Sequence, residues 1–214
     1  MRGTKVKSKS GRRPPVKVKA GPELPLLPIA VAGILVVIAI VLVIIFVTNS
    51  KATNASQTPV AGIPCDVGEQ TQVHYHAALQ IVSGGVVHNL PANIGIVSTP
   101  TPCFYWLHVH PGSPNIIHIE SPKSRTFTLK DFFAVWTKWS GINQPLDATH
   151  VSTLTLTPDQ KLVVYVDNQD DKKGPQLYTG DPNKIVLKSH EVITLEITPP
   201  AVTPPPAFTF GVGL

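Results

Sequence analysis

Residues 103–120 (CFYWLHVHPGSPNIIHIE) contain two short runs in which apolar and polar residues alternate. A period of two is typical of a β-strand with one buried face. The runs Phe104–His110 and Ile116–Glu120 flank the segment PGSPN, whose residues favour turns. This stretch predicts a β-hairpin and places a sheet at the centre of the fold.

The loop length decides which residues of the hairpin lie opposite one another. A five-residue loop pairs His108 with His118 and gives the sheet one aliphatic and one polar face. The aliphatic face then holds Leu107, Val109, Ile117 and Ile119, and the polar face holds His108, His110, His118 and Glu120. A four-residue loop would place His118 among the aliphatic residues. Because register follows the face that is buried, we expect the five-residue loop.

An apolar run near the N-terminus predicts a membrane anchor. Ile29–Val47 is a run of 19 residues without a charge. As an α-helix it would rise ~30 Å, the thickness of the hydrocarbon core. Cleavable signal peptides have a shorter apolar region of ~7–15 residues, so we expect an uncleaved transmembrane helix over residues 29–47.

The positive charge is concentrated before this run. Residues 1–28 carry 8 − 1 = +7, whereas the rest of the chain carries 10 − 12 = −2. By the positive-inside rule, residues 1–28 form a cytoplasmic tail and the chain after Val47 lies outside the cytoplasm. We therefore expect a single-pass type II protein of the cytoplasmic or plasma membrane. Contact with the lipid bilayer explains the basic charge, and we expect no nucleic-acid partner.

Composition divides the remaining chain into three parts. Residues 48–63 are small and polar without periodicity, which predicts a flexible linker. Residues 64–198 carry the alternating runs and form the expected extracytoplasmic domain. Residues 199–214 form a proline-rich tail, in which Phe208 and Phe210 can pack back on the domain.

Further strands and one helix are expected in the domain. Val73–Ile81 alternates, and Val151–Thr157 with Lys161–Asp167 predicts a second hairpin. Thr128 is the expected N-cap of an amphipathic helix that ends at Gly141, with Asp131 completing the cap. The expected fold class is α+β: a mostly antiparallel sheet of several hairpins, covered on one face by this helix.

Cys65 and Cys103 are the only two cysteines. Both lie on the predicted outer side of the membrane, where thiols oxidise, so a disulfide is expected. The alternative is a copper–thiolate site with two histidines and an axial methionine. The only methionine is Met1, so the disulfide is favoured.

The histidines of the polar face predict a metal site. Strand residues i and i+2 are ~6.6 Å apart, so both side chains of a His-x-His can lean toward one ion. The candidate ligands are His108, His110, His118 and Glu120, joined by His74 and His76 if their strand is a neighbour. Imidazole with a carboxylate suits zinc, copper(II) or ferrous iron, and copper binds most tightly at equal geometry.

Two other functions are compatible with these residues. The histidines can be solvent-facing or hydrogen-bonded side chains of a surface interaction or structural module that binds no ion. A metal with an open coordination position can instead make the domain a metal-dependent enzyme. The sequence contains no phosphate loop, G-x-S-x-G or H-E-x-x-H motif, so it does not decide whether the protein is an enzyme.

Several segments resemble a family of prokaryotic proteins of uncharacterised function. They are IPCDVGEQ (63–70), HYHAALQI (74–81), LPANIGI (90–96), CFYWLHVH (103–110), IIHIESP (116–122), TFTLKDFF (126–133) and YTGDPNKIVLKSHEVITLEI (178–197). The resemblance implies a single membrane anchor followed by one outer His-rich domain. It implies no activity.

Overall fold

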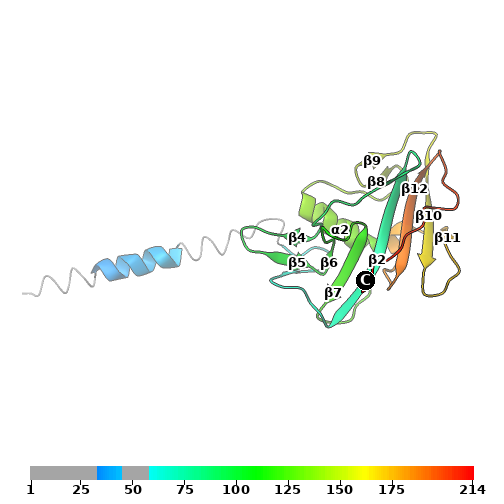
Figure 1. Cartoon of the computed structure of the whole chain (residues 1–214). Helices are drawn as coiled ribbons and strands as arrows, with labels where there is room; N and C mark the ends of the chain where they lie inside the picture. The colour runs from blue at the N-terminus through cyan, green and yellow to red at the C-terminus, as the bar shows by residue number, and fades with distance from the viewer. Residues whose placement is uncertain (1–32, 45–57) are drawn as a thin grey trace, which may run out of the picture. The chain divides into compact units, whose positions relative to one another are not determined.

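A computed structural model describes residues 33–44 and 58–214 (Figure 1). The chain separates into residues 1–51 and 52–214, which we describe in turn. In the first part, residues 33–44 form an exposed helix. Within the described ranges, no helix has both the length and the apolar character needed to cross a membrane. The expected tail 1–28, and residues 29–32 and 45–57 of the expected transmembrane helix and linker, lie outside those ranges.

The second part is an α+β domain, as the sequence predicts. Its main sheet has seven strands in the order β11-β10-β12-β2-β7-β6, with β3 paired to β2. These strands are β2 (Val73–Ser83), β3 (Val86–His88), β6 (Leu107–His108), β7 (Ile116–Ser121), β10 (Lys161–Asn168), β11 (Gln176–Tyr178) and β12 (Glu191–Thr198). All neighbouring strands are antiparallel except β12 and β2, which are parallel.

The remaining strands form two small sheets. One has the order β1-β5-β4 and the other pairs β8 with β9. Their bounds are β1 (Cys65–Asp66), β4 (Ile96–Val97), β5 (Cys103–Tyr105), β8 (His150–Val151) and β9 (Leu154–Thr155). A short 3-10 helix, η2 (Pro182–Lys184), precedes β12.

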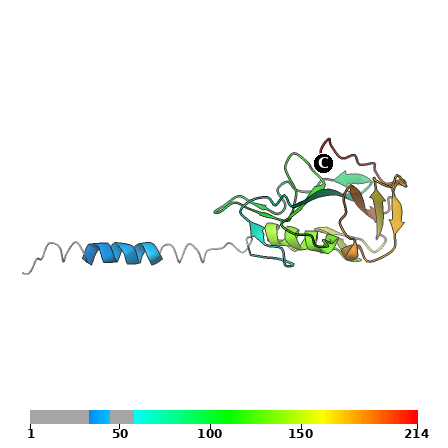
Figure 2. The same cartoon turned by 90° about the horizontal axis from the view of Figure 1, so that it is seen from below.

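Helix α2 (Leu129–Ser140) covers one face of the main sheet (Figure 2). The helix begins where the sequence predicts, because Thr128 and Asp131 form a capping box, and it ends at Gly141 in the left-handed conformation. Phe132 and Phe133 pack in the core with Leu107 and Ile119 of the sheet. The apolar periodicity of the helix and the aliphatic face of the hairpin thus meet, as expected.

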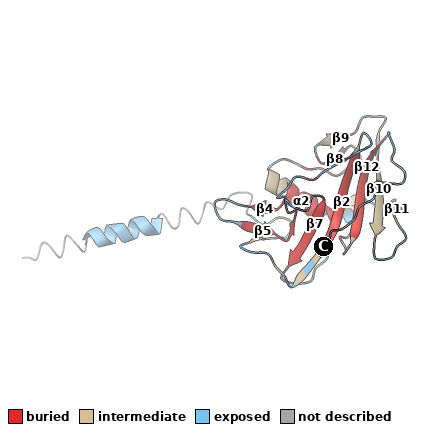
Figure 3. Cartoon of the chain, in the orientation of Figure 1, coloured by how far each residue is buried: buried red, intermediate tan, exposed pale blue. Residues whose placement is uncertain are grey.

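The C-terminal segment crosses the opposite face of the sheet (Figure 2). The Val202 backbone N–H donates to Glu196 Oε1 at 2.7 Å, and Gln169 Nε2 donates to the Phe208 carbonyl at 2.6 Å. The Phe210 ring lies 5.4 Å from the His190 ring. Strand β2 is buried on both faces along residues 76–82 (Figure 3). The domain therefore has three layers, and residues 199–214 belong to its packing.

Two expected strand arrangements are wrong. Strand β10 does not pair with the run before it: β8 pairs with β9 through a tight turn at Ser152, and β10 lies between β11 and β12. The expected strand Phe104–His110 is interrupted at Trp106. The preceding residues join β1 and β4, and the following ones join β7. In both cases the alternation marks a strand correctly, but its partner depends on distant residues.

The beginning of the domain is held at several points. Cys65 and Cys103 form the expected disulfide. Asp66 Oδ2 accepts a 2.7 Å hydrogen bond from Trp106 Nε1. Ile63 is fully buried, and the Tyr105 hydroxyl donates to the Thr58 carbonyl at 2.6 Å. Residues 58–63, which the sequence assigns to the linker, are thus packed on the domain.

Candidate metal centre

Three adjacent strands bring the candidate ligands together. His108 on β6 lies opposite His118 on β7, and His118 lies opposite His76 on β2. His74 on β2 lies opposite Glu120 on β7. The five-residue loop and its register are therefore confirmed, and the strand that carries His74 and His76 is the neighbour that the metal hypothesis required.

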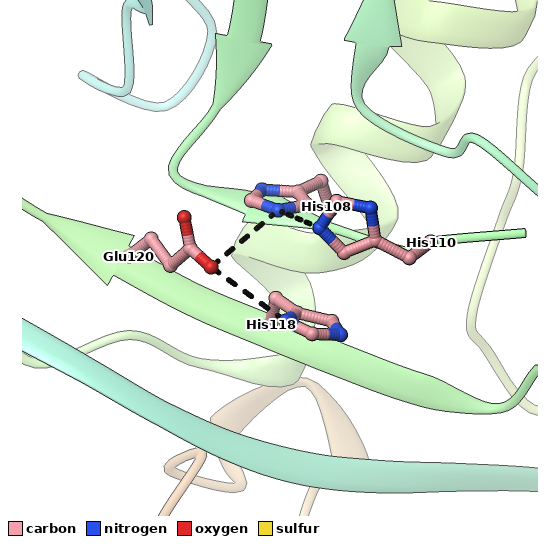
Figure 4. A group of neighbouring side chains, drawn as sticks. All are labelled: His108, His110, His118 and Glu120. Carbon is pink, nitrogen blue, oxygen red and sulfur yellow. Dashed lines mark hydrogen bonds and ion pairs between the residues drawn. The ribbon is translucent and has the colours of Figure 1, made fainter. Parts of the chain in front are cut away.

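The first group of potential ligands is His108, His110, His118 and Glu120 (Figure 4). One donor atom from each of these residues lies within 4.8 Å of the others. His110 follows β6. The backbone of Val109 donates a hydrogen bond to Ile94 and accepts one from Asn93, and these two bonds hold the segment that positions the His110 ring. The Nε2 atoms of His108 and His110 are 3.2 Å apart.

The second group is His74, His76 and His118, whose donor atoms also lie within 4.8 Å of one another. The Nε2 atoms of His74 and His76 are 3.1 Å apart. Glu120 Oε1 lies 3.3 Å from His74 Nε2 and 3.8 Å from His108 Nε2, so this carboxylate adjoins both groups. All six residues singled out in the sequence are therefore brought into one cluster.

Glu69 also reaches the cluster, and sequence analysis missed it. Its Oε1 lies 3.1 Å from His110 Nε2 and 3.9 Å from His108 Nε2. Glu69 follows Cys65 by four residues, and the disulfide ties Cys65 to the strand that leads into His108. An acidic residue close to a predicted disulfide was the signal that would have placed it beside the hairpin.

The alternative of solvent-facing histidines does not hold at the centre of the polar face. His108 has no exposed surface, and His118 and Glu120 are 6% and 4% exposed. His74, His110 and Glu69 line the solvent-facing edge, where their side chains are 31–45% exposed. The neighbouring strand β2 and the segment that carries Glu69 come from distant parts of the sequence, so alternation alone cannot reveal the burial.

The tautomer of His108 follows from its hydrogen bond. Its Nδ1 lies 2.8 Å from the Tyr105 carbonyl, which can only accept, so Nδ1 carries the proton. In the neutral ring, Nε2 then presents its lone pair to the cluster. An imidazole oriented through its outer N–H in this way is the usual arrangement of a metal-ligating histidine.

Burial keeps the central imidazoles neutral. It lowers the pKa of His108 to about 4, against the opposing effects of the Tyr105 carbonyl and Glu120. Burial, with His118 and His74 nearby, also lowers the pKa of His76 to about 4. For Glu120, burial acts to raise the pKa, but His118, His108 and His74 together lower it below its usual value. His108 and His76 thus offer neutral imidazoles beside the ionised carboxylate of Glu120, the protonation states that bind metals.

His118 is the most unusual side chain of the cluster. Neither of its ring nitrogens has a hydrogen-bond partner among the described residues, although the residue is buried. Its nearest acidic atom, Glu120 Oε1, lies 3.6 Å from Nδ1, and Glu120 Oε2 also lacks a hydrogen bond. Leaving a buried polar group unsatisfied costs ~1–3 kcal/mol. An ion bound by one nitrogen of His118 and by the Glu120 carboxylate would remove that cost for the atoms that it binds.

The spacing of the donor atoms suits a transition metal. With bonds of ~2.0–2.1 Å, two ligand atoms of a tetrahedral ion are roughly 3.3–3.4 Å apart. The closest donor pairs of the cluster are separated by 3.1–3.3 Å. The His/Glu groups can therefore hold a metal ion with small side-chain movements.

The remaining histidines have other partners. His88 contacts the Ser83 carbonyl, His150 contacts Asp147 and Thr149, and His190 contacts Asp170. These contacts are consistent with the structural roles expected for His150 and His190. The three residues belong to neither ligand group.

Comparisons with protein-family models, curated proteins and solved structures found no match.

Proposed function

We propose that the domain binds a transition-metal ion, copper(II) or zinc, through His108, His110, His118 and Glu120. The observation that carries the proposal is His118, a buried imidazole whose two nitrogens lack hydrogen bonds within the described residues while neighbouring donor atoms converge on it. Three imidazoles and one carboxylate whose donor atoms lie within 4.8 Å of one another also match the ligand types that both metals accept.

Burial favours this proposal over a surface interaction module. A recognition surface presents its contacting side chains to a partner, whereas His108, His118 and Glu120 are almost inaccessible. A structural polar network would satisfy its buried members. The unpartnered atoms of His118 and Glu120 are better explained by an ion, which is small enough to enter from the edge formed by His110 and Glu69.

Metal titration of the full-length chain, without a histidine tag, tests the proposal. We expect saturable binding of copper(II) and zinc at pH 7.5, with copper bound more tightly. His118→Leu removes both unpartnered nitrogens at similar volume, and His110→Ala removes a ligand at the exposed edge. Loss of a residue that only supports a metal ligand lowers metal affinity by up to about 100-fold. Because these substitutions remove a ligand itself, each should lower the affinity by more than that.

His150→Ala is the matched control, because His150 is a half-exposed histidine outside the cluster. Its affinity should equal that of the unchanged protein, and near-UV circular dichroism should show that all variants are folded. Equal affinity of the unchanged protein and His118→Leu would refute the site and favour the interaction module.

We further propose that residues 29–47 anchor this domain to the cytoplasmic or plasma membrane, with residues 1–28 in the cytoplasm. The proposal rests on 19 uncharged residues beside a segment of charge +7. The helix over residues 33–44, which is exposed along its length, is compatible with it. The domain would then meet metal ions outside the cytoplasm.

Protease added to intact cells or spheroplasts tests the orientation. An antibody against the C-terminal domain should lose its band, and an antibody against residues 1–28 should retain a short protected fragment. A cytoplasmic marker protein that stays intact is the control. Protection of the domain together with that marker would refute the proposed topology.

A further inference from the structure

We infer that the cluster holds two metal ions, one at each His-x-His pair, with His118 and Glu120 between them. The inference rests on the proposed function and extends it from one ion to a dinuclear centre. The second ion belongs to His74 and His76, and transition metals that accept imidazole are the class that fits.

The two His-x-His pairs have the same geometry. The Nε2 atoms are 3.2 Å apart in His108/His110 and 3.1 Å apart in His74/His76. Within each pair the rings are steeply inclined, at 86° and 72°. A pair of converging Nε2 atoms at this spacing matches two ligands on one ion, and the cluster contains that arrangement twice.

His118 has the same relation to both pairs. Its ring is nearly parallel to His108 on one side and to His74 on the other, with interplanar angles of 10° and 24°. It is edge-on to His110 and His76, both at 4.5 Å between ring centroids. His118 is therefore the centre of two similar half-sites, and each half-site faces a buried ring whose nitrogens lack hydrogen bonds among the described residues.

One ion cannot use all of these donors. Ligands of a single ion lie within twice the bond length of one another, ~4.2 Å for imidazole nitrogen. Among the described residues, no set of donor atoms within 4.8 Å of one another includes all of these side chains; the atoms form two such groups, and only His118 belongs to both. Glu120 completes the link, because Oε1 lies near His74 and His108 and Oε2 is buried without a hydrogen bond. A single carboxylate oxygen that faces both pairs, as Oε1 does, can bind both ions of a two-metal site, whose ions are ~3.5–4 Å apart.

The half-sites differ in one acidic residue. Glu69 adjoins His110 and His108, and within the described residues no acid other than Glu120 forms an ion pair with His74. The ion at His108/His110 is therefore held by more negative charge and should bind first. The ion at His74/His76 should bind more weakly and keep a position open to solvent, since the His74 side chain is 45% exposed.

Counting bound ions tests the inference. Native mass spectrometry of the full-length, untagged chain with excess zinc should show two ions in the unchanged protein and one in His74→Ala. His74 is half-exposed, so this variant should remain folded. His150→Ala is the control for zinc held at surface histidines and should retain two ions.

Electron paramagnetic resonance with copper(II) tests the bridge. Two bridged copper(II) ions couple magnetically, so the unchanged protein should show less than half of its bound copper in the spectrum. His74→Ala should show all of its copper as a mononuclear signal.

The outcomes separate the two proposals. No bound ion refutes both, whereas one ion in the unchanged protein refutes the dinuclear centre and leaves the proposed function intact. Two ions that persist in His74→Ala, or two copper ions with a full uncoupled signal, also overturn the inference.

Discussion

The metal-free protein is expected to lose several kcal/mol of unfolding free energy as the pH falls from 6.5 to 4. His108 and His76 have an ordinary pKa of 6.5, which burial lowers to about 4 in the folded protein. Between these values the unfolded chain binds more protons than the folded one, so acid favours unfolding. At about 1.4 kcal/mol per pKa unit, His108 alone accounts for roughly 3 kcal/mol.

Carboxylates modify this dependence at its acidic end. The pKa of Glu120 is lowered, so its contribution is present above the unfolded value of 4.5 and is lost as the pH falls further. Burial raises the pKa of Glu191, which acts in the opposite direction and stabilises the fold as that group becomes protonated. The steep loss should therefore lie between pH 6.5 and 4, where the histidines titrate.

Urea denaturation of the chelator-treated full-length chain at several pH values measures this effect. The variant His108→Leu is the comparison, because it removes one buried imidazole. Its unfolding free energy should fall less between pH 6.5 and 4, by the amount that His108 contributes. A profile that is flat between pH 6.5 and 4 would show that the cluster is not kept neutral by burial.

Loss of the disulfide is expected to cost about 4 kcal/mol of stability. Cys65 and Cys103 are 38 residues apart, and in the chain-entropy model closing a loop of this size removes conformational entropy from the unfolded chain and so raises its free energy by about that amount. In the folded protein the bond reinforces the pairing of β1 with β5. Both effects stabilise the segment that leads to Glu69.

The double variant Cys65→Ala/Cys103→Ala should show this loss in urea denaturation at pH 7.5. The unchanged protein with and without a reducing agent provides a control, since reduction should reproduce the effect of the substitutions. A loss of less than ~1 kcal/mol would mean that the unfolded chain is already restricted or that strand pairing alone holds the segment.

Local patterns correctly predicted the features that depend on neighbouring residues. The alternation of residues 104–120 and the length of the PGSPN loop gave the pairing of His108 with His118, because a hairpin register follows from its turn and its buried face. Thr128, Asp131 and Gly141 marked the ends of α2, because caps satisfy backbone groups within a few residues. The presence of only two cysteines identified the disulfide.

Strand neighbours could not be predicted in the same way. The sequence identified His74 and His76 as candidate ligands but did not show that β2 pairs with β7. That pairing joins segments about 40 residues apart, and many strand orders satisfy the same alternation. The false hairpin between Val151–Thr157 and Lys161–Asp167 has the same origin, since β10 pairs instead with strands that follow it in the chain.

The sequence by itself therefore determined which side chains share a face of the central hairpin and which residues begin and end the helix. Only the tertiary structure decided that β2 extends the histidine face, that Glu69 reaches it, and that the C-terminal segment covers the same side of the sheet. The physical reason is that register and caps are set by hydrogen bonds between near neighbours. Burial and ligand geometry depend instead on which distant surfaces pack together to remove apolar area from water.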